Sequence, residues 1–379
     1  KKNEIIAPDD EISDPSTNPW QLAREFIDET YEDEGEIIIR HHSSTFYIYS
    51  RKEKTYRQVT ETELDAEVTC WLATKIENVT RRFVKDVTHC VMANVNVPWP
   101  NPLPIYSKLD LGEVSPSSTI DIAERQWIAM QNGILDMNAL IEGRIIEECL
   151  LPHTSNWLNT IKLTYPFDPD QTCGEWMRFI SQVMKGDDEL IAVVQEVFGY
   201  CLWTSVELEK FFLFVGSGQN GKSITLKVLE QMLGQKNVAA FGPKDLEDKY
   251  MITYLQGKLA SICSDLDDFH TFAERIVKKI CSGETLVGDR KFKDMVEWKP
   301  KTKLIFSTNK LPRMVDVTQG IWRRAMIIPF DLKVSKSEKD TRLINKLTTQ
   351  KELSGIFNWA IQGLMRLMET REFTESKAS

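Results

Sequence analysis

The stretch that decides the fold is FFLFVGSGQNGKSITLKVLEQML, residues 211–233. Its first five residues, Phe211 to Val215, have the length and apolar character of a buried strand. Residues 216–223 then fit the pattern G-x-x-x-x-G-K-[S/T], and apolar residues recur at helical spacing from Ile224 until Gly234. A strand, a glycine-rich loop and a helix in this order predict a phosphate-binding loop.

The residue types of this loop suit a nucleotide. We expect ATP to be bound by Gly216, Ser217, Gly218, Gln219, Asn220, Gly221, Lys222, Ser223 and Ile224. Glycines permit tight turns that aim backbone N–H groups inward, and the helix N-terminus adds a partial positive charge. Lys222 is expected to reach the β- and γ-phosphates, and the Ser223 hydroxyl to ligate Mg²⁺. The alternative is a glycine-rich turn that fits the pattern by accident.

Two further predicted strands, residues 258–263 and 302–307, are followed by polar side chains. Asp265 and Asp267 follow the first strand, and Asn309 follows the second. One carboxylate, assigned to Asp265, can hold Mg²⁺, and a second can polarise the attacking water. Asn309 can orient the same water. Which aspartate activates water stays open. The alternative is that Asp265, Asp267 and Asp268 start a solvated turn, an interpretation that the preceding phosphate loop disfavours.

Taken together, these segments resemble superfamily 3 helicases, in the branch of poxvirus and phage or plasmid primase-helicases. Residues 211–223 resemble the Walker A segment of that branch, and KICSGET (279–285) the start of its B′ region. FSTNKLP (306–312) resembles motif C, and DVTQGIWRR (316–324) the arginine-finger segment. One departure is aspartate at 265 and 267, where related Walker B segments often carry glutamate.

The resemblance implies an AAA+-like motor that forms a hexameric ring with ATP between subunits. Single-stranded DNA would thread the pore in the 3′–5′ direction, and forked duplexes would be unwound. Arg323 and Arg324 would include the arginine finger, with one of them anchoring the strand that follows. A primase or primase-polymerase domain is expected in the same full-length chain, consistent with a first residue, Lys1, that is not Met.

A locally basic stretch predicts the DNA contact. Residues 278–313 hold ten basic and four acidic side chains, in a chain of net charge −9. Residues 285–287 and 296–298 can pair as strands, which brings Arg290, Lys291 and Lys293 near the connecting tip. Together with Lys279 these cations are our predicted DNA-binding residues, which would grip phosphates without a base code. A solvated lysine-rich turn is the alternative.

The fold class is α/β, with a mostly parallel sheet preceded by a mainly helical N-terminal region that carries a small β-meander. We expect an accessory or collar region at 1–120, a helical domain at 121–205, the motor core at 206–335 and a C-terminal helical segment at 336–379. The first region should contain a helix from Pro19 to about Tyr31, strands at 36–40, 45–50 and 55–59, and a helix at 61–77. The second should hold two helices between about Trp157 and Tyr200, divided by residues 185–188.

Composition narrows the class of protein. Seven cysteines without C-x-x-C spacing argue against a disulfide framework or a zinc site. Reduced cytosolic thiols are the better interpretation of these cysteines, and no apolar run reaches the length of a membrane span. We expect a protein of the cytoplasm, that of the host cell if phage or plasmid encoded. Two rivals to the DNA motor stay open: an ATPase that remodels protein partners of a replication or defence complex, and a scaffold whose ATP site only locks an assembly.

Overall fold

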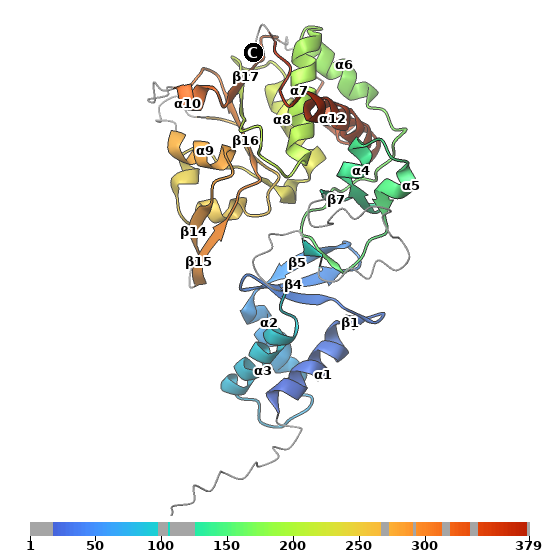
Figure 1. The fold of residues 1–379 in the computed structure, drawn as a ribbon, viewed down its shortest axis with the longest axis vertical. Helices are drawn as coiled ribbons and strands as arrows, with labels where there is room; N and C mark the ends of the chain where they lie inside the picture. Colours follow the sequence, from blue (N-terminus) through green and yellow to red (C-terminus); the bar gives the residue numbers. More distant parts are fainter. Residues whose placement is uncertain are drawn as a thin grey trace, which may run out of the picture. The chain divides into compact units, whose positions relative to one another are not determined.

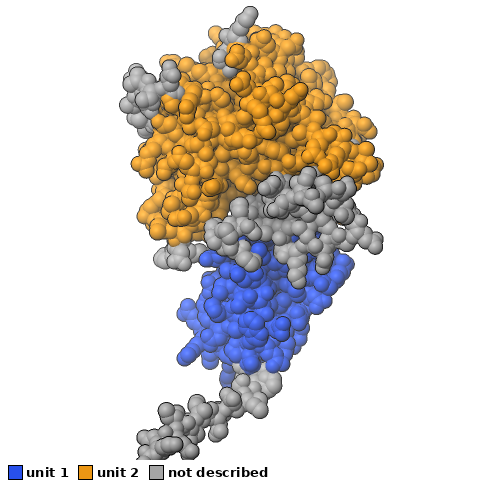
Figure 2. Space-filling model, in the orientation of Figure 1, with its two compact units in different colours: residues 1–115, 154–160 blue, residues 116–153, 161–379 orange. Residues whose placement is uncertain are grey.

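The chain forms two compact units in a computed structural model, which describes residues 18–97, 105–106, 126–266, 273–290, 293–312, 319–333 and 340–376. Residues 1–115 and 154–160 make up the N-terminal unit, and residues 116–153 and 161–379 the larger unit (Figure 2). The four-part division expected from the sequence stays a prediction.

The N-terminal unit packs helices against a small antiparallel meander. Its helices are α1 (Pro19–Tyr31), α2 (Glu61–Leu72) and α3 (Arg81–Asn94), and its strands are β1 (Glu32–Asp33), β2 (Glu36–Ile37), β3 (Ile39–His42), β4 (Thr45–Ser50), β5 (Thr55–Val59), β6 (Ile105–Tyr106) and β10 (Trp157–Leu158). Asn18 caps α1, and Thr60 forms a capping box with Glu63 at the start of α2. The predicted first helix and the meander are therefore confirmed, while α2 ends earlier than expected.

The larger unit is built on a five-stranded sheet in which every pairing is parallel. The strand order is β12 (Val238–Ala239), β13 (Ala260–Cys263), β16 (Lys303–Thr308), β11 (Phe211–Val215) and β17 (Ala325–Pro329). This confirms the predicted parallel sheet. The strand that leads into the glycine-rich loop lies inside the sheet, and β16 separates it from β13.

Helices cover both faces of this sheet (Figure 1). Phe212 and Phe214 face a core shared with α6 (Gly174–Val183), α7 (Asp188–Leu202), α8 (Lys222–Leu233) and α12 (Gln350–Thr370). Phe211 and Leu213 face the opposite core, which is shared with α9 (Glu274–Cys281), α10 (Gln319–Trp322) and the 3₁₀ turns η4 (Asp245–Glu247) and η5 (Met251–Leu255). The period of two along β11 is that of a strand buried on both faces.

The segment before the sheet is less helical than predicted. Residues 159–173 form no helix; α6 begins only at Gly174, because Pro166 and Pro169 interrupt any helix before it. The predicted break at 185–188 is confirmed, since Lys185 and Gly186 have φ of +56° and +72° and Asp187 caps α7. The remaining elements are β7 (Trp127–Ala129), β8 (Ile134–Asp136), α4 (Met137–Ile141), α5 (Ile146–Cys149), β9 (Leu150–Leu151), η3 (Gln235–Asn237) and α11 (Leu343–Leu347).

Helices α7 and α12 pack closely enough to need glycine. A Cβ on Gly363 would lie 2.6 Å from the Gln195 carbonyl oxygen, and one on Gly199 would overlap the Ala360 carbonyl. The buried carboxylate of Glu196 accepts hydrogen bonds from Arg366 Nε at 2.7 Å and from Thr374 N at 2.8 Å. The upstream helical segment and the C-terminal helix therefore form one layer over the sheet. Among the described residues no helix combines the length and apolarity that crossing a membrane requires.

Candidate nucleotide-binding site

The glycine-rich loop adopts a conformation that side chains would hinder. Gly218 and Gly221 have φ of +92° and +85°, in the left-handed region. A Cβ on Gly221 would lie 2.5 Å from Val183 Cγ2, and a Cβ on Gly216 would overlap the Phe330 carbonyl. Gly221 is the N-cap of α8, so the loop ends at a helix N-terminus, whose first backbone N–H groups have no partner within the helix. The loop is therefore shaped to bring its backbone close to an anion.

Lys222 lies inside the loop and is buried. Its Nζ donates hydrogen bonds to the carbonyl oxygens of Thr308 at 2.6 Å and Gly216 at 3.0 Å. Burial lowers the pKa of Lys222, and the nearby Asp265 carboxylate opposes that shift. The ammonium group is thus held beside the loop by neutral carbonyls, where a phosphate oxygen would be a stronger partner.

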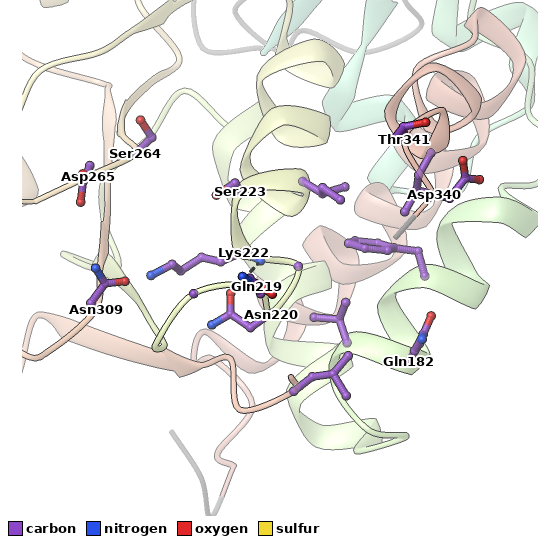
Figure 3. Close-up of a pocket in the computed structure, with 17 residues that line it drawn as sticks. Gln182, Gln219, Asn220, Lys222, Ser223, Ser264, Asp265, Asn309, Asp340 and Thr341 are labelled. Atoms are coloured by element: carbon purple, nitrogen blue, oxygen red, sulfur yellow. Dashed lines mark hydrogen bonds between the residues drawn. The ribbon is translucent and has the colours of Figure 1, made fainter. Parts of the chain in front are cut away.

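A pocket of about 520 Å³ opens in front of the loop, a volume typical of small-molecule sites. Figure 3 shows Lys222 pointing to the side where Asp265 and Asn309 lie, while Gln182, Asp340 and Thr341 lie on the other side. The lining residues are Phe179, Gln182, Val183, Gly218, Gln219, Asn220, Gly221, Lys222, Ser223, Ile224, Ser264, Asp265, Asn309, Leu332, Asp340, Thr341 and Leu343. The pocket therefore has one end at Lys222, Asp265 and Asn309, which we expect to take the phosphates, and a second end that Phe179, Val183 and Leu343 make more apolar.

Most of the predicted nucleotide site comes together at this pocket. Lys222, Ser223, Asp265 and Asn309 all line it, as do residues 218–224, whereas Gly216 and Ser217 do not. The strand before Asn309 pairs directly with β11, whereas β16 separates the strand before Asp265 from β11. Asp267 lies outside the described residues.

Sequence reasoning missed the second end of the pocket. Phe179, Gln182 and Val183 come from α6, about forty residues before the loop, and Asp340, Thr341 and Leu343 come from the segment that enters α11. Ser264, next to Asp265, was missed as well. No spacing or motif in the sequence connects residues 179–183 and 340–343 with the loop, so no local signal for these two segments was available.

The two arginines of the predicted finger lie away from the pocket. They directly precede β17, which runs parallel to β11 with Phe211 opposite Ala325. They therefore lie at the amino ends of these strands, whereas the loop follows the carboxyl end of β11. The length of the strands alone separates their amino ends from their carboxyl ends by roughly 15 Å. Arg324 is buried and pairs with Glu209 at 2.7 Å, whereas the Arg323 side chain is 67% exposed. Neither arginine lines the pocket of its own chain.

The predicted hairpin is confirmed and is longer than expected. Strands β14 (Leu286–Arg290) and β15 (Lys293–Trp298) pair antiparallel and project from the sheet (Figure 1). Arg290 lies next to the tip and donates a hydrogen bond to Gln256 Oε1 at 2.6 Å. Lys291 lies outside the described residues, and the side chain of Lys293 is not described. At the base of the hairpin, Lys279 lines a smaller pocket together with Lys249 and Arg275.

Comparisons with known proteins point to viral helicases. A family model described as "Family of unknown function (DUF5906)" matches residues 214–324. "Putative helicase L207/L206" of Acanthamoeba polyphaga mimivirus is 24% identical over 234 residues, 58% of this chain and 23% of that protein. "Putative helicase 121R" of Invertebrate iridescent virus 3 is 24% identical over 225 residues, 56% of this chain and 23% of that protein. The chain thus spans about a quarter of the length of these relatives.

The fold has a solved counterpart. "The A form apo structure of NrS-1 C terminal region-CTR" aligns with a TM-score of 0.53 at 12% identity, over 95% of this chain and 76% of that one. "The apo structure of NrS-1 C terminal region (305-718)" aligns equally well. This chain is therefore similar in fold to the NrS-1 C-terminal region and similar in sequence, over somewhat more than half its length, to viral proteins named as helicases.

Proposed function

We propose that this chain hydrolyses ATP and uses the energy to move along single-stranded DNA, as the ring-forming, AAA+-like helicase part of a superfamily 3 primase-helicase. The observation that carries the proposal is the pocket in which Lys222, Ser223, Asp265 and Asn309 converge at the carboxyl edge of a parallel sheet. Such an edge, next to a helix N-terminus, is where α/β proteins bind phosphates.

The phosphate end of the pocket has the donors that ATP and Mg²⁺ require. The Ser223 hydroxyl and the Asp265 carboxylate are hard oxygen ligands that would hold the ion, which screens the phosphate charges when bound. Lys222 would exchange its carbonyl partners for the β- and γ-phosphate oxygens. Asn309 and an aspartate, Asp265 or Asp267, would orient the water that attacks the γ-phosphorus, giving ADP and phosphate.

The finger arginine must come from a second copy of the chain. Arg323 lies at the amino ends of the strands, away from the pocket of its own subunit, and its side chain is exposed. It can therefore reach only a pocket on a neighbouring subunit. Arg324 is buried and hydrogen-bonded within its own subunit. We therefore assign the finger to Arg323 and the anchoring role to Arg324. An arrangement in which each subunit completes the next is head-to-tail, and such an interface forms a ring when the rotation between subunits closes. We propose that it closes as a hexamer.

The hairpin and its base would contact DNA. Lys249, Arg275 and Lys279 lie at the base, Arg290 lies beside the tip, and the Tyr254 side chain is 67% exposed in the adjoining turn η5. Cationic side chains suit phosphates, and an exposed aromatic ring suits a stacked base. DNA binding is then sequence-tolerant, which suits a 3′–5′ translocase that moves along any sequence of a forked DNA, and it is salt-sensitive.

Two further parts of the proposal concern the whole protein. We propose that it acts in the cytoplasm and that the full-length chain also contains a primase or primase-polymerase domain.

The decisive experiment measures ATP turnover with and without single-stranded DNA. A DNA motor is expected to turn over faster with DNA and to unwind a forked duplex, with binding that weakens steeply as salt increases. A protein-remodelling ATPase would hydrolyse ATP without responding to DNA, and a scaffold would show almost no turnover. Either of those outcomes would reject the motor.

A further inference from the structure

One carboxylate faces both arginines before β17. Glu209 Oε2 lies 2.7 Å from Arg324 Nη2 and 3.9 Å from Arg323 Nη2. The Arg324 side chain is only 10% exposed and also donates a hydrogen bond from Nη1 to the Gly320 carbonyl oxygen at 2.9 Å. Arg324 therefore takes the close, charge-assisted hydrogen bond, and Arg323 stays at the surface, farther from the same carboxylate.

The backbone around Glu209 holds the arginine pair from the other side. Lys210 Nζ donates a hydrogen bond to the Arg323 carbonyl oxygen at 2.6 Å, and Phe211 N donates one to the Arg324 carbonyl oxygen at 2.9 Å. Glu209 itself has a φ of +52°, in the left-handed region that residues other than glycine rarely adopt. Such a conformation persists where surrounding contacts determine it, and the two guanidinium groups are contacts of that kind.

Charge explains why this position needs an acid. Two adjacent guanidinium groups repel each other, and burying one of them without a counter-ion is costly. Glu207, two residues earlier, pairs with Arg371 at 2.8 Å and is already engaged there. If the Glu209 side chain were removed, the Gly320 carbonyl would be the one acceptor left to the Arg324 guanidinium among the described residues, and the carboxylate that orients both arginines would be lost.

We propose that Glu209 is the positioning residue of the finger: it neutralises and anchors Arg324 so that Arg323 projects toward the pocket of the next subunit. This inference rests on the proposed finger between subunits. Glu209 does not touch the nucleotide, because it precedes β11 and the phosphate loop follows the other end of that strand. Its effect on hydrolysis therefore appears in the neighbouring subunit's pocket and not in its own.

Steady-state ATP hydrolysis by the full chain gives the first test. Glu209→Ala is expected to lower kcat between about tenfold and a hundredfold, the loss typical of a misplaced catalytic group. The KM for ATP should not change, since the pocket of each subunit is intact. Glu209→Gln keeps an acceptor oxygen without the charge and should fall between Glu209→Ala and the wild type. Glu207→Ala, in the same loop with its own arginine partner, is the matched control and should keep the wild-type kcat.

Mixed assemblies locate the defect. Glu209→Ala subunits have an intact pocket and a poorly placed finger, whereas Lys222→Ala subunits have a defective pocket and an intact finger. Mixing them should restore hydrolysis at the interfaces that combine the two intact halves. Mixing Glu209→Ala with Arg323→Ala should restore nothing, because both lack a working finger. A defect confined to the subunit's own β11 would not be rescued by Lys222→Ala.

The outcomes separate this inference from the proposed function. If Arg323→Ala is rescued by Lys222→Ala but neither Glu209 variant is, Glu209 is not a positioning residue and the finger between subunits stands. A kcat within twofold of the wild type for Glu209→Ala leads to the same conclusion. No rescue of Arg323→Ala, with mixed assemblies demonstrated by native mass spectrometry, would overturn both. Should circular dichroism show Glu209→Ala unfolded, the isosteric Glu209→Gln decides.

Discussion

Gly221 lies directly against Val183, so that a Cβ on the glycine would come within 2.5 Å of Val183 Cγ2. The last glycine of the phosphate loop is therefore packed on α6, a helix that ends about forty residues earlier in the chain. Because α6 also contributes Phe179 and Gln182 to the pocket, the loop and the second end of the pocket share one support.

This contact predicts different effects for two glycines of the loop. Gly218→Ala and Gly221→Ala each place a side chain at positive φ, at a cost of roughly 1–2 kcal/mol. Only Gly221→Ala also meets a neighbour, since nothing lies within 4 Å of a Cβ on Gly218. We expect Gly221→Ala to weaken binding of a non-hydrolysable ATP analogue more than Gly218→Ala does. Adding Val183→Ala should recover part of the loss, and equal affinities for the two single variants would contradict this account.

Lys222→Ala should lower ATP turnover by at least about a hundredfold, because it removes a charge-assisted contact to the transferring phosphate. The control is Lys227→Ala on the same helix, whose ammonium pairs with Glu230 at 2.8 Å near the surface. That variant should hydrolyse ATP like the wild type. Turnover of Lys222→Ala within twofold of the wild type would reject the assignment of the site.

Phe179→Ala should raise the KM for ATP about tenfold and leave kcat nearly unchanged, since an apolar wall binds the ground state and the transition state alike. Met177→Ala, on the exposed side of the same helix, serves as the control. Thermal melting separates a binding defect from a folding defect, because Phe179 also packs on Trp176. If the KM stayed the same in a folded Phe179→Ala variant, Phe179 would not be a contact of the bound ATP.

Lys293→Ala and Lys279→Ala should weaken binding of single-stranded DNA and reduce its dependence on salt concentration. Basal ATP hydrolysis without DNA should survive, and Lys293→Ala should abolish unwinding. Lys351→Ala at the start of α12 removes an exposed cation distant in sequence from the hairpin and controls for net charge. Unwinding of a forked duplex by Lys293→Ala at the wild-type rate would exclude Lys293 as the pore contact.

Lys303 predicts a dependence of stability on pH. This lysine is fully buried, and desolvation lowers its pKa to about 7, from 10.5 in the unfolded chain. Between these values the unfolded state binds more protons, so this group makes the free energy of unfolding increase from about pH 7 toward pH 10.5. Lys303→Met should flatten that slope in denaturant titrations, while Lys351→Met should not. Identical slopes in both variants would contradict the prediction.

Local patterns in the sequence were sufficient to predict the strand and the helix on either side of the phosphate loop, and also the first helix. The strand at 211–215, the helix after Gly221 and the first helix at 19–31 lie where the pattern puts them. The reason is that glycine spacing, capping residues and apolar periodicity act over a few neighbouring positions. The hairpin was visible in the same way, although its strands extend further toward the tip than the predicted segments.

Only the tertiary structure shows the features that depend on contacts between residues far apart in the chain. The position of β16 between β11 and β13, and the contact of Val183 with Gly221, follow from the order in which parallel strands and helices pack. Arg323 and Arg324 are identical in type and adjacent, so no local pattern distinguishes them. Their difference arises because Glu209, more than a hundred residues earlier, lies close to one guanidinium group and farther from the other.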